Sequence, residues 1–233
     1  MKDYRTIAGW RTNLYRLLSS VYIQIPRRET IELNWEPALC LVGSSPVGTE
    51  KALQEIEKAV ELIKAFASRE SPLSEKSITD LSKDWTRLFR GVGRNGLLPP
   101  YESLYRTGRS QKEPLKEINR LFSRMGVRVP EEWHQSADYI GVELDFMRFL
   151  CQKELRAWER EEMDSAVEVV EIERSFVQNH LSLWIFDFCE KMLAQACEDF
   201  YKGVARLTMG LVNHDGIWLT RLFNLTHSGR GER

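Results

Sequence analysis

Apolar residues recur at every third or fourth position along almost all of this 233-residue chain. That spacing puts them on one face of an α-helix, because one helical turn takes about 3.6 residues. No stretch alternates apolar and polar residues between turn signals, as a half-buried β-strand would. The sequence therefore predicts an all-α fold, a bundle of many helices in a single domain over residues 1–233.

Helix boundaries follow from where the apolar period starts and stops. We expect helices over residues 4–25, 49–68, 77–89, 114–125, 137–155, 176–188 and 190–212, with shorter ones over 29–41 and 215–225. The charged stretch 158–173 is predicted to be an exposed helical excursion. Residues 127–136 lose the period and contain Pro130, so they are the predicted hinge if the domain divides into subdomains 1–126 and 137–225.

The helix that begins at Ala137 is apolar around most of its circumference, which is typical of a central helix in a bundle. Asp138 is expected to cap its start. Glu143 lies within the apolar part, where an isolated ionised carboxylate would be very costly. We therefore expect Glu143 to be a structural buried acid that is either neutral or paired, with a helix N-terminus or an arginine such as Arg87.

Residues 84–105 combine a helix end, a glycine loop and a double proline. Trp85, Leu88 and Phe89 share one helical face, and Pro99 with Pro100 then stops the helix and allows a new turn to begin. The loop glycines are Gly91, Gly93 and Gly96, and the new turn carries Tyr101, Glu102 and Tyr105. Any one of these aromatic residues is more often part of a core, but the combination favours a binding groove.

Composition and motifs argue against several kinds of function. The chain has 33 basic and 34 acidic residues, so attraction to nucleic-acid phosphate is not expected to drive binding. Four dispersed cysteines are typical of reduced thiols in a cytosolic protein, and four dispersed histidines predict no metal site. Neither a phosphate loop nor a nucleophile motif is present, and no apolar run is long enough for a membrane span. We predict no catalytic residue and no cofactor.

Four sequence pieces carry a resemblance to a known family. They are DWTRLF before the glycine loop, PPYESLY after it, DYIGVELDFM, and HLSLW followed by FYKGVARL. In this order they resemble the TorD/DmsD family of molybdoenzyme-specific chaperones, to which NarJ is related. The resemblance extends from Asp84 to Leu207 and implies an all-helical cytoplasmic protein without catalytic activity.

The resemblance also implies a partner and a site. Relatives bind the N-terminal, often twin-arginine, signal segment of a dimethyl sulfoxide, trimethylamine oxide or nitrate reductase until the molybdopterin cofactor is loaded. The positions that match the family's peptide-binding residues are Trp85, Leu88, Phe89, Pro100, Tyr101, Glu102, Tyr105, Asp138 and Tyr139. Where the family has an Asp-His pair preceded by proline, this chain has Asp138 and Tyr139 preceded by Ala137. The change removes a group that titrates near neutral pH.

Physical reasoning about such a partner agrees with this site. A signal segment offers an apolar stretch that suits an aromatic groove, and arginines that Glu102 and Asp138 could bind. We expect Trp85→Ala to weaken peptide binding by about 2 kcal/mol without loss of helix. A homodimer could form by exchange of the C-terminal half at the hinge, which sedimentation at several concentrations would detect.

Two other classes of function remain open from the residues alone. One is a helical protein that binds a small molecule or a guanine nucleotide, although the chain lacks a phosphate loop. The other is a helical transcription regulator, which would need a basic recognition helix. Only the short RRET segment at Arg27 is basic near a terminus.

Overall fold

The computed structural model describes residues 2–29, 31, 50–92, 96–106 and 113–228. Within these ranges the regular structure is helical, with no β-strand and one isolated β-bridge, so the predicted all-α fold is confirmed. None of the helices in these ranges combines the length and the apolar character that crossing a membrane requires. The helix predicted over 29–41 falls mostly outside the described residues, as does the loop glycine Gly93.

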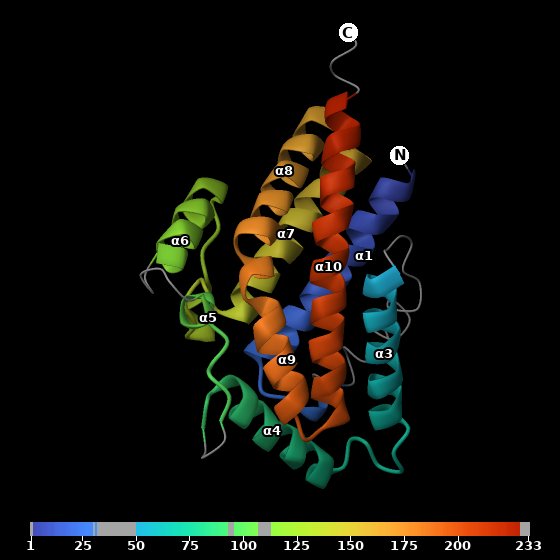
Figure 1. Ribbon diagram of the computed structural model, residues 1–233, viewed down its shortest axis with the longest axis vertical. Helices are drawn as coiled ribbons and strands as arrows, with labels where there is room; N and C mark the ends of the chain where they lie inside the picture. Colours follow the sequence, from blue (N-terminus) through green and yellow to red (C-terminus); the bar gives the residue numbers. More distant parts are fainter. Residues whose placement is uncertain (1, 30, 32–49, 93–95, 107–112, 229–233) are drawn as a thin grey trace.

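The helices of Figure 1 have the following bounds: α1 Lys2–Ile23, α3 Glu50–Ala67, α4 Glu75–Phe89, α5 Glu102–Tyr105, α6 Glu113–Met125, η1 Glu131–Trp133, α7 Ile140–Glu159, α8 Met163–Asn179, η2 Leu181–Leu183, α9 Ile185–Gln195 and α10 Asp199–Ser228. The two η elements are short 3₁₀ helices.

Several predicted boundaries were wrong. The helix predicted over 176–188 is divided, because α8 ends at Asn179 and α9 begins at Ile185 after a 3₁₀ turn. The stretch 158–173 is not simply an exposed excursion, since α8 packs against α7 and α10 and buries Val170. The predicted helix over 215–225 is the continuation of α10. Helix α4 begins earlier than expected because the Ser74 hydroxyl accepts a hydrogen bond from the Ser77 amide and caps it.

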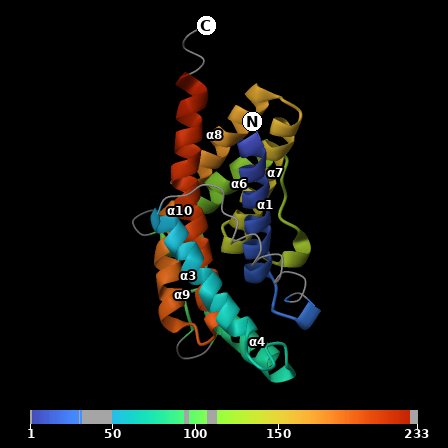
Figure 2. The same ribbon diagram turned by 90° about the vertical axis from the view of Figure 1, so that its right-hand side faces the viewer.

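The core lies between pairs of helices that are distant in sequence. Helix α1 packs along α7, and α3 packs along α10, with α8 against both α7 and α10 (Figures 1 and 2). Each of the first two pairs joins residues before 126 with residues after 137. A single domain over residues 1–233 stays a prediction, and this interlocked packing supports it.

Two glycines allow α3 and α10 to approach closely. A Cβ atom on Gly203 would lie 2.5 Å from Ile63 Cγ1, and one on Gly210 would lie 2.7 Å from Ile56 Cγ1. Both distances are shorter than carbon atoms tolerate, so any larger residue would push the helices apart. The seven-residue spacing places both glycines on the same face of α10.

Candidate functional site

The two segments predicted to form a site meet in the structure. The Glu102 amide donates to the Asp138 carbonyl, and the Ile140 amide donates to the Pro100 carbonyl, both at 2.9 Å. These bonds form the isolated bridge between Tyr101 and Tyr139, whose rings lie 5.2 Å apart. We call residues 97–106 and 135–140 together the junction. The chain thus brings PPYESLY and DYIG into one place despite more than thirty intervening residues.

Glycines shape the loop that leads from α4 into the junction. Gly91 has a φ of 65°, a conformation that glycine adopts without strain. A Cβ on Gly96 would lie 2.5 Å from the carbonyl carbon of Gly91, so these two residues approach closely through their backbones. The Leu97 amide then donates to the Arg87 carbonyl at 3.2 Å, which fixes the returning chain beside the end of α4.

Asp138 and Tyr139 are both held by hydrogen bonds within the chain, Asp138 to α5 and Tyr139 to α1. Asp138 is 1% exposed, and its carboxyl accepts hydrogen bonds from the Ser136 hydroxyl and, at 3.4 Å, from the Ser103 amide. It therefore caps α5, and the expectation that it caps α7 was wrong, because Tyr139 occupies that position without a side-chain cap. The buried Tyr139 hydroxyl donates to the Tyr22 carbonyl at 2.7 Å and ties the junction to α1.

Glu102 is fully buried, and both of its carboxyl oxygens have partners within the chain. One carboxyl oxygen lies 2.9 Å from His180 Nδ1, and the other accepts from Arg106. Arg106 also reaches the Asn179 carbonyl at 3.4 Å and is only 10% exposed, so it is not a solvated charge. These contacts hold α5 against the end of α8, and they leave Glu102 without a free oxygen for a partner's arginine.

Glu143 is fully buried beside two other acids. Its Oε2 accepts from Trp184 Nε1 at 3.3 Å, whereas Oε1 has no hydrogen-bond partner among the described residues. Burial raises the pKa of Glu143 well above its ordinary value, and the nearby Glu102 and Asp138 raise it further. Both effects favour the neutral form of the Glu143 carboxyl, which is one of the two predicted alternatives.

Arg87 is not the partner of Glu143. Its guanidinium contacts the Asp84 carboxyl and the Gln195 carbonyl instead. The second Asp84 oxygen accepts from the amides of Cys197 and Glu198 at 2.9 Å, just before α10 begins. Arg87 and Asp84 therefore join the end of α4 to the turn between α9 and α10, away from Glu143.

Replacing Glu143 with glutamine should leave stability nearly unchanged at acidic pH, since the amide keeps one donor and one acceptor in the same shape. A raised pKa means that the folded state holds the proton more tightly, so the wild type loses stability as pH rises above the ordinary value of 4.5. Glu143→Gln avoids this loss. Its stability relative to wild type should grow by about 1.4 kcal/mol per pH unit until the folded pKa is reached.

Urea unfolding of both proteins from pH 4.5 to pH 8 would measure this difference. Asp145→Asn is a matched control, because Asp145 lies on the same helix but is part-exposed and bound to Arg148. A difference between wild type and Glu143→Gln that stays constant over the range would show that the Glu143 carboxyl is already ionised in the folded state.

The aromatic face of α4 does not form an open groove. Trp85, Leu88 and Phe89 are 1%, 0% and 1% exposed. Trp85 Nε1 donates to the Val21 carbonyl at 2.9 Å, and the Phe89 ring lies 5.1 Å from the Tyr22 ring. This face packs onto α1 and the bundle core, because a strongly amphipathic helix gains most by burying its apolar side.

Three leucines in or beside the junction are exposed instead, and we call them the leucine patch. Leu98, Leu104 and Leu183 are 48%, 38% and 51% exposed. Their segments meet at Tyr105, whose hydroxyl donates to the Leu98 carbonyl at 2.7 Å and whose ring lies 5.5 Å from that of Trp184. Sequence reasoning missed these leucines, although an apolar residue within a glycine-proline loop is a usable signal.

A groove of about 530 Å³ lies beside the junction, between α6 and residues 127–137. Its apolar lining includes Leu115, Phe122 and Val129, and we call it the α6 groove. Gln135 lines it as well and lies 2.6 Å from the Tyr101 hydroxyl. The α6 groove is therefore continuous with the junction.

Exposed carboxyl groups lie on the elements that border the junction. Glu131 and Glu132 are exposed on η1, which precedes Gln135 by a few residues. Asp187 on α9 is 56% exposed, pairs with Lys191, and lies near enough to raise the pKa of Tyr105, after burial as the main cause. A cation from solvent can reach these acids, unlike the buried Glu102 and Asp138.

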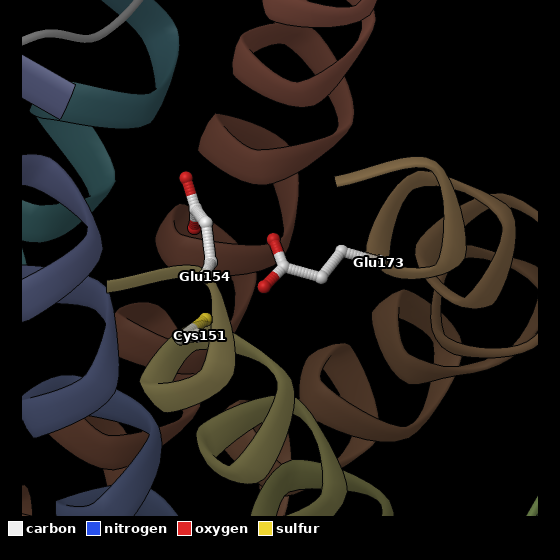
Figure 3. Close-up of side chains that lie close together, drawn as sticks. All are labelled: Cys151, Glu154 and Glu173. Carbon is white, nitrogen blue, oxygen red and sulfur yellow. The ribbon is translucent and has the colours of Figure 1, made fainter. Parts of the chain in front are cut away.

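Away from the junction, Cys151 and Glu154 of α7 and Glu173 of α8 form a buried group within 4.8 Å (Figure 3). Each glutamate already accepts from the Arg11 guanidinium at 2.6 Å. Burial also raises the pKa of the Cys151 thiol well above its ordinary value. Arg11 therefore supplies the positive charge that the two glutamates bind, and the group stabilises the core.

Comparisons with known proteins agree with the sequence resemblance. The family model described as nitrate reductase delta subunit matches residues 48–190. The chaperone protein TorD of Vibrio cholerae serotype O1 (strain El Tor Inaba N16961) is 24% identical over 229 residues, which is 97% of this chain and 100% of the relative.

Two further relatives carry the same name. TorD of Vibrio parahaemolyticus is 31% identical over 142 residues, 60% of this chain and 64% of the relative. TorD of Shewanella pealeana is 25% identical over 224 residues, 92% and 91% of the two chains. No solved structure gives a significant match. The chain belongs to the nitrate reductase delta subunit family, as a TorD-type chaperone of molybdoenzyme maturation and not an enzyme.

Proposed function

We propose that this chaperone binds the N-terminal, twin-arginine signal segment of a molybdopterin-containing oxidoreductase in the cytoplasm, until its cofactor is loaded. The observation that carries the proposal is the junction. It joins the two sequence segments that resemble the family's peptide-binding motifs, and exposed leucines and exposed acids lie around it. A signal segment has the complementary features, an apolar stretch and a basic end.

The apolar stretch of the signal segment would lie across the leucine patch and extend into the α6 groove. Leucines at 38–51% exposure bury further area when a helix covers them, and apolar burial contributes about 25 cal/mol per Å². The half-buried Tyr101 lies between the two surfaces, so it would contact the peptide. Trp85, Leu88 and Phe89 would support the site from below without touching the peptide.

The arginines of the signal segment would pair with the acids that solvent reaches. Glu131, Glu132 and Asp187 border the junction on two sides. Guanidinium groups bind carboxylates through two parallel hydrogen bonds, which lysine cannot reproduce. A signal peptide with both arginines replaced by lysine should therefore bind more weakly than the natural peptide.

Replacing Leu104 and Leu183 with serine should weaken binding of a synthetic signal peptide by about tenfold, or about 1.4 kcal/mol. Both side chains are exposed, so the loss should appear in affinity and not in stability. Leu225→Ser is the matched control, because Leu225 is 66% exposed near the far end of α10 (Figure 1).

Titration calorimetry on the full chain would measure the three affinities. The proposal fails if the double variant and wild type bind the peptide equally well. It also fails if Leu225→Ser weakens binding as much as the double variant does, because the effect would then reflect general loss of apolar surface. Thermal unfolding of each variant checks that the fold is intact.

A homodimer by exchange of the C-terminal half stays a prediction. Exchange at residues 127–136 would keep the α1–α7 and α3–α10 contacts but form them between two copies. The second copy would then complete each junction, since Pro100 and Asp138 lie on opposite sides of the hinge.

A further inference from the structure

A second groove, of about 520 Å³, lies between the end of α6 and the turn that joins α7 to α8. The basic side chains in its lining are Arg124, Lys153, Arg156 and Arg160. Figure 1 places this end of α6 and the α7–α8 turn in the upper half of the molecule, away from α5 and α9. We call it the basic groove.

The cations of the basic groove lack internal partners. Among the residues that the structure describes, none of the four forms an ion pair, and the Lys153 ammonium has only the Phe149 ring at 5.8 Å. Arg106 at the junction, by contrast, is paired with the carboxyl of Glu102. Four unneutralised cations around one hollow repel one another, and an anionic ligand would relieve this repulsion.

Three of the cations form a line. Residues 153, 156 and 160 follow the spacing i, i+3 and i+7, which places them along one face of the last turns of α7 and its C-cap, over about 10 Å. Arg124 of α6 lines the same hollow. A compact anion such as phosphate would reach one or two of these groups. A chain of carboxylates with matching spacing would reach all of them.

Other residues of the groove also favour a peptide. Glu162 and Glu168 are part of the lining and repel any anion close to them, so carboxylates spaced along a segment suit the groove better than a compact phosphate group. Met125 and Ile172 are partly exposed there and offer apolar contacts between the charges. The lining thus combines cations, anions and apolar groups, as a surface for a mixed protein segment does.

We propose that the basic groove binds an acidic helical segment of the client enzyme, outside its signal segment. The identification of the client rests on the proposed function, whereas binding of an acidic peptide does not. The two sites would then hold two parts of one client, and linked sites raise the overall affinity through effective concentration.

The test uses the full chain and a fluorescein-labelled helical peptide with glutamates at i, i+3 and i+7. Fluorescence anisotropy at low salt should show binding that weakens as salt screens the charges. Arg156→Glu with Arg160→Glu should weaken it by about tenfold or more, because two attractions become repulsions. Lys51→Glu with Lys64→Glu is the matched control, since both lysines are exposed on α3 and the net charge changes equally.

Three results would overturn the proposal. The first is that the α3 control weakens binding as much as the groove variant does. The second is that a peptide with glutamine in place of glutamate binds equally well. The third is that inorganic pyrophosphate displaces the peptide at equal concentration. Arg156→Gln with Arg160→Gln should show a smaller loss in the same direction, and it replaces the charge-reversed variant if that one does not fold. The signal peptide should bind the groove variant like wild type, so failure at the leucine patch is distinguished from failure here.

Discussion

Replacing Arg11 with methionine is expected to lower the free energy of unfolding by about 3–5 kcal/mol, the cost of leaving buried charges uncompensated. The Arg11 guanidinium is fully buried on α1 and binds three carboxyl groups from three other helices. It donates to Glu154 and Glu173 at 2.6 Å and to both oxygens of Asp215 at about 3 Å. Methionine fills a similar volume but offers no donor.

The pKa values of the three acids indicate which charge matters most. Burial raises the pKa of Glu154 and, more strongly, that of Glu173, although Arg11 lowers both. Burial acts in the same direction on Asp215, but Arg11 and His214 outweigh it, so the pKa of Asp215 lies below its ordinary value. Arg11 and Asp215 therefore form the ionised pair, and Tyr15 adds a hydrogen bond to Asp215 at 2.8 Å.

The loss of unfolding free energy caused by Arg11→Met should depend on pH. Without the guanidinium, burial raises the folded-state pKa values of the three carboxyl groups with less opposition. A raised folded pKa gives stability that is present at low pH and lost as pH rises. The variant should therefore lie closest to wild type in acid and fall further below it towards neutral pH, which urea unfolding at several pH values would measure.

Two further variants make this prediction specific to the buried charges. Arg16→Met, on the exposed side of the same helix, should change stability by no more than about 0.5 kcal/mol. Adding Asp215→Asn to Arg11→Met should recover part of the lost stability, because it removes the carboxylate that the first change left unpaired. Additive losses from the two changes would mean that the pair does not interact, contrary to its geometry.

The helices could be predicted because their signal is local. An apolar period of three to four residues requires only that one face be buried, and α1, α3, α6 and α7 show it clearly. The break between α8 and α9 could not be predicted, since residues 176–188 keep the period while the chain turns. Two contacts hold that turn, one between Arg106 and the Asn179 carbonyl and one between Glu102 and His180, and the partners in each lie more than seventy residues apart.

The sequence predicted that two segments meet at the candidate site, but it did not predict which of their side chains are exposed. Family resemblance and turn residues brought Pro100–Tyr105 and Asp138–Tyr139 together, and the backbone bridge joins them. Exposure could not be predicted, because Trp85 and Leu104 both follow α-helical spacing, yet one is 1% and the other 38% exposed. Which face of an element stays open depends on what packs over it.

The partners of Arg11 could not be predicted from the sequence. An arginine among Ile7, Leu14 and Leu18 is rare on the apolar face of a helix, but its three partners are more than 140 residues away. A charge in a buried position indicates that partners exist, without naming them. Only the packing of α1 against α7, α8 and α10 shows which acids they are.

Replacing Trp85 with alanine is expected to lower the free energy of unfolding by about 3–5 kcal/mol, the usual cost of deleting a large core side chain. Trp85 is 1% exposed, its ring lies 5.7 Å from that of Phe89, and its indole bonds to the Val21 carbonyl. The loss expected from sequence alone was about 2 kcal/mol in peptide affinity, as for an exposed aromatic anchor. Burial moves the expected effect from affinity to stability.

Urea unfolding and peptide titration on the same samples would separate the two interpretations. Trp85→Phe keeps a ring and loses the bond to Val21, so it should cost about 1–3 kcal/mol and remain folded enough to titrate. Its affinity for the signal peptide should then equal that of wild type. Trp133→Ala is the control for tryptophan loss, because Trp133 on η1 is only half-buried. If Trp85→Phe weakened peptide binding without changing stability, α4 would have to open so that Trp85 contacts the peptide. A change to a ring that stays buried in the core would alter stability as well as affinity.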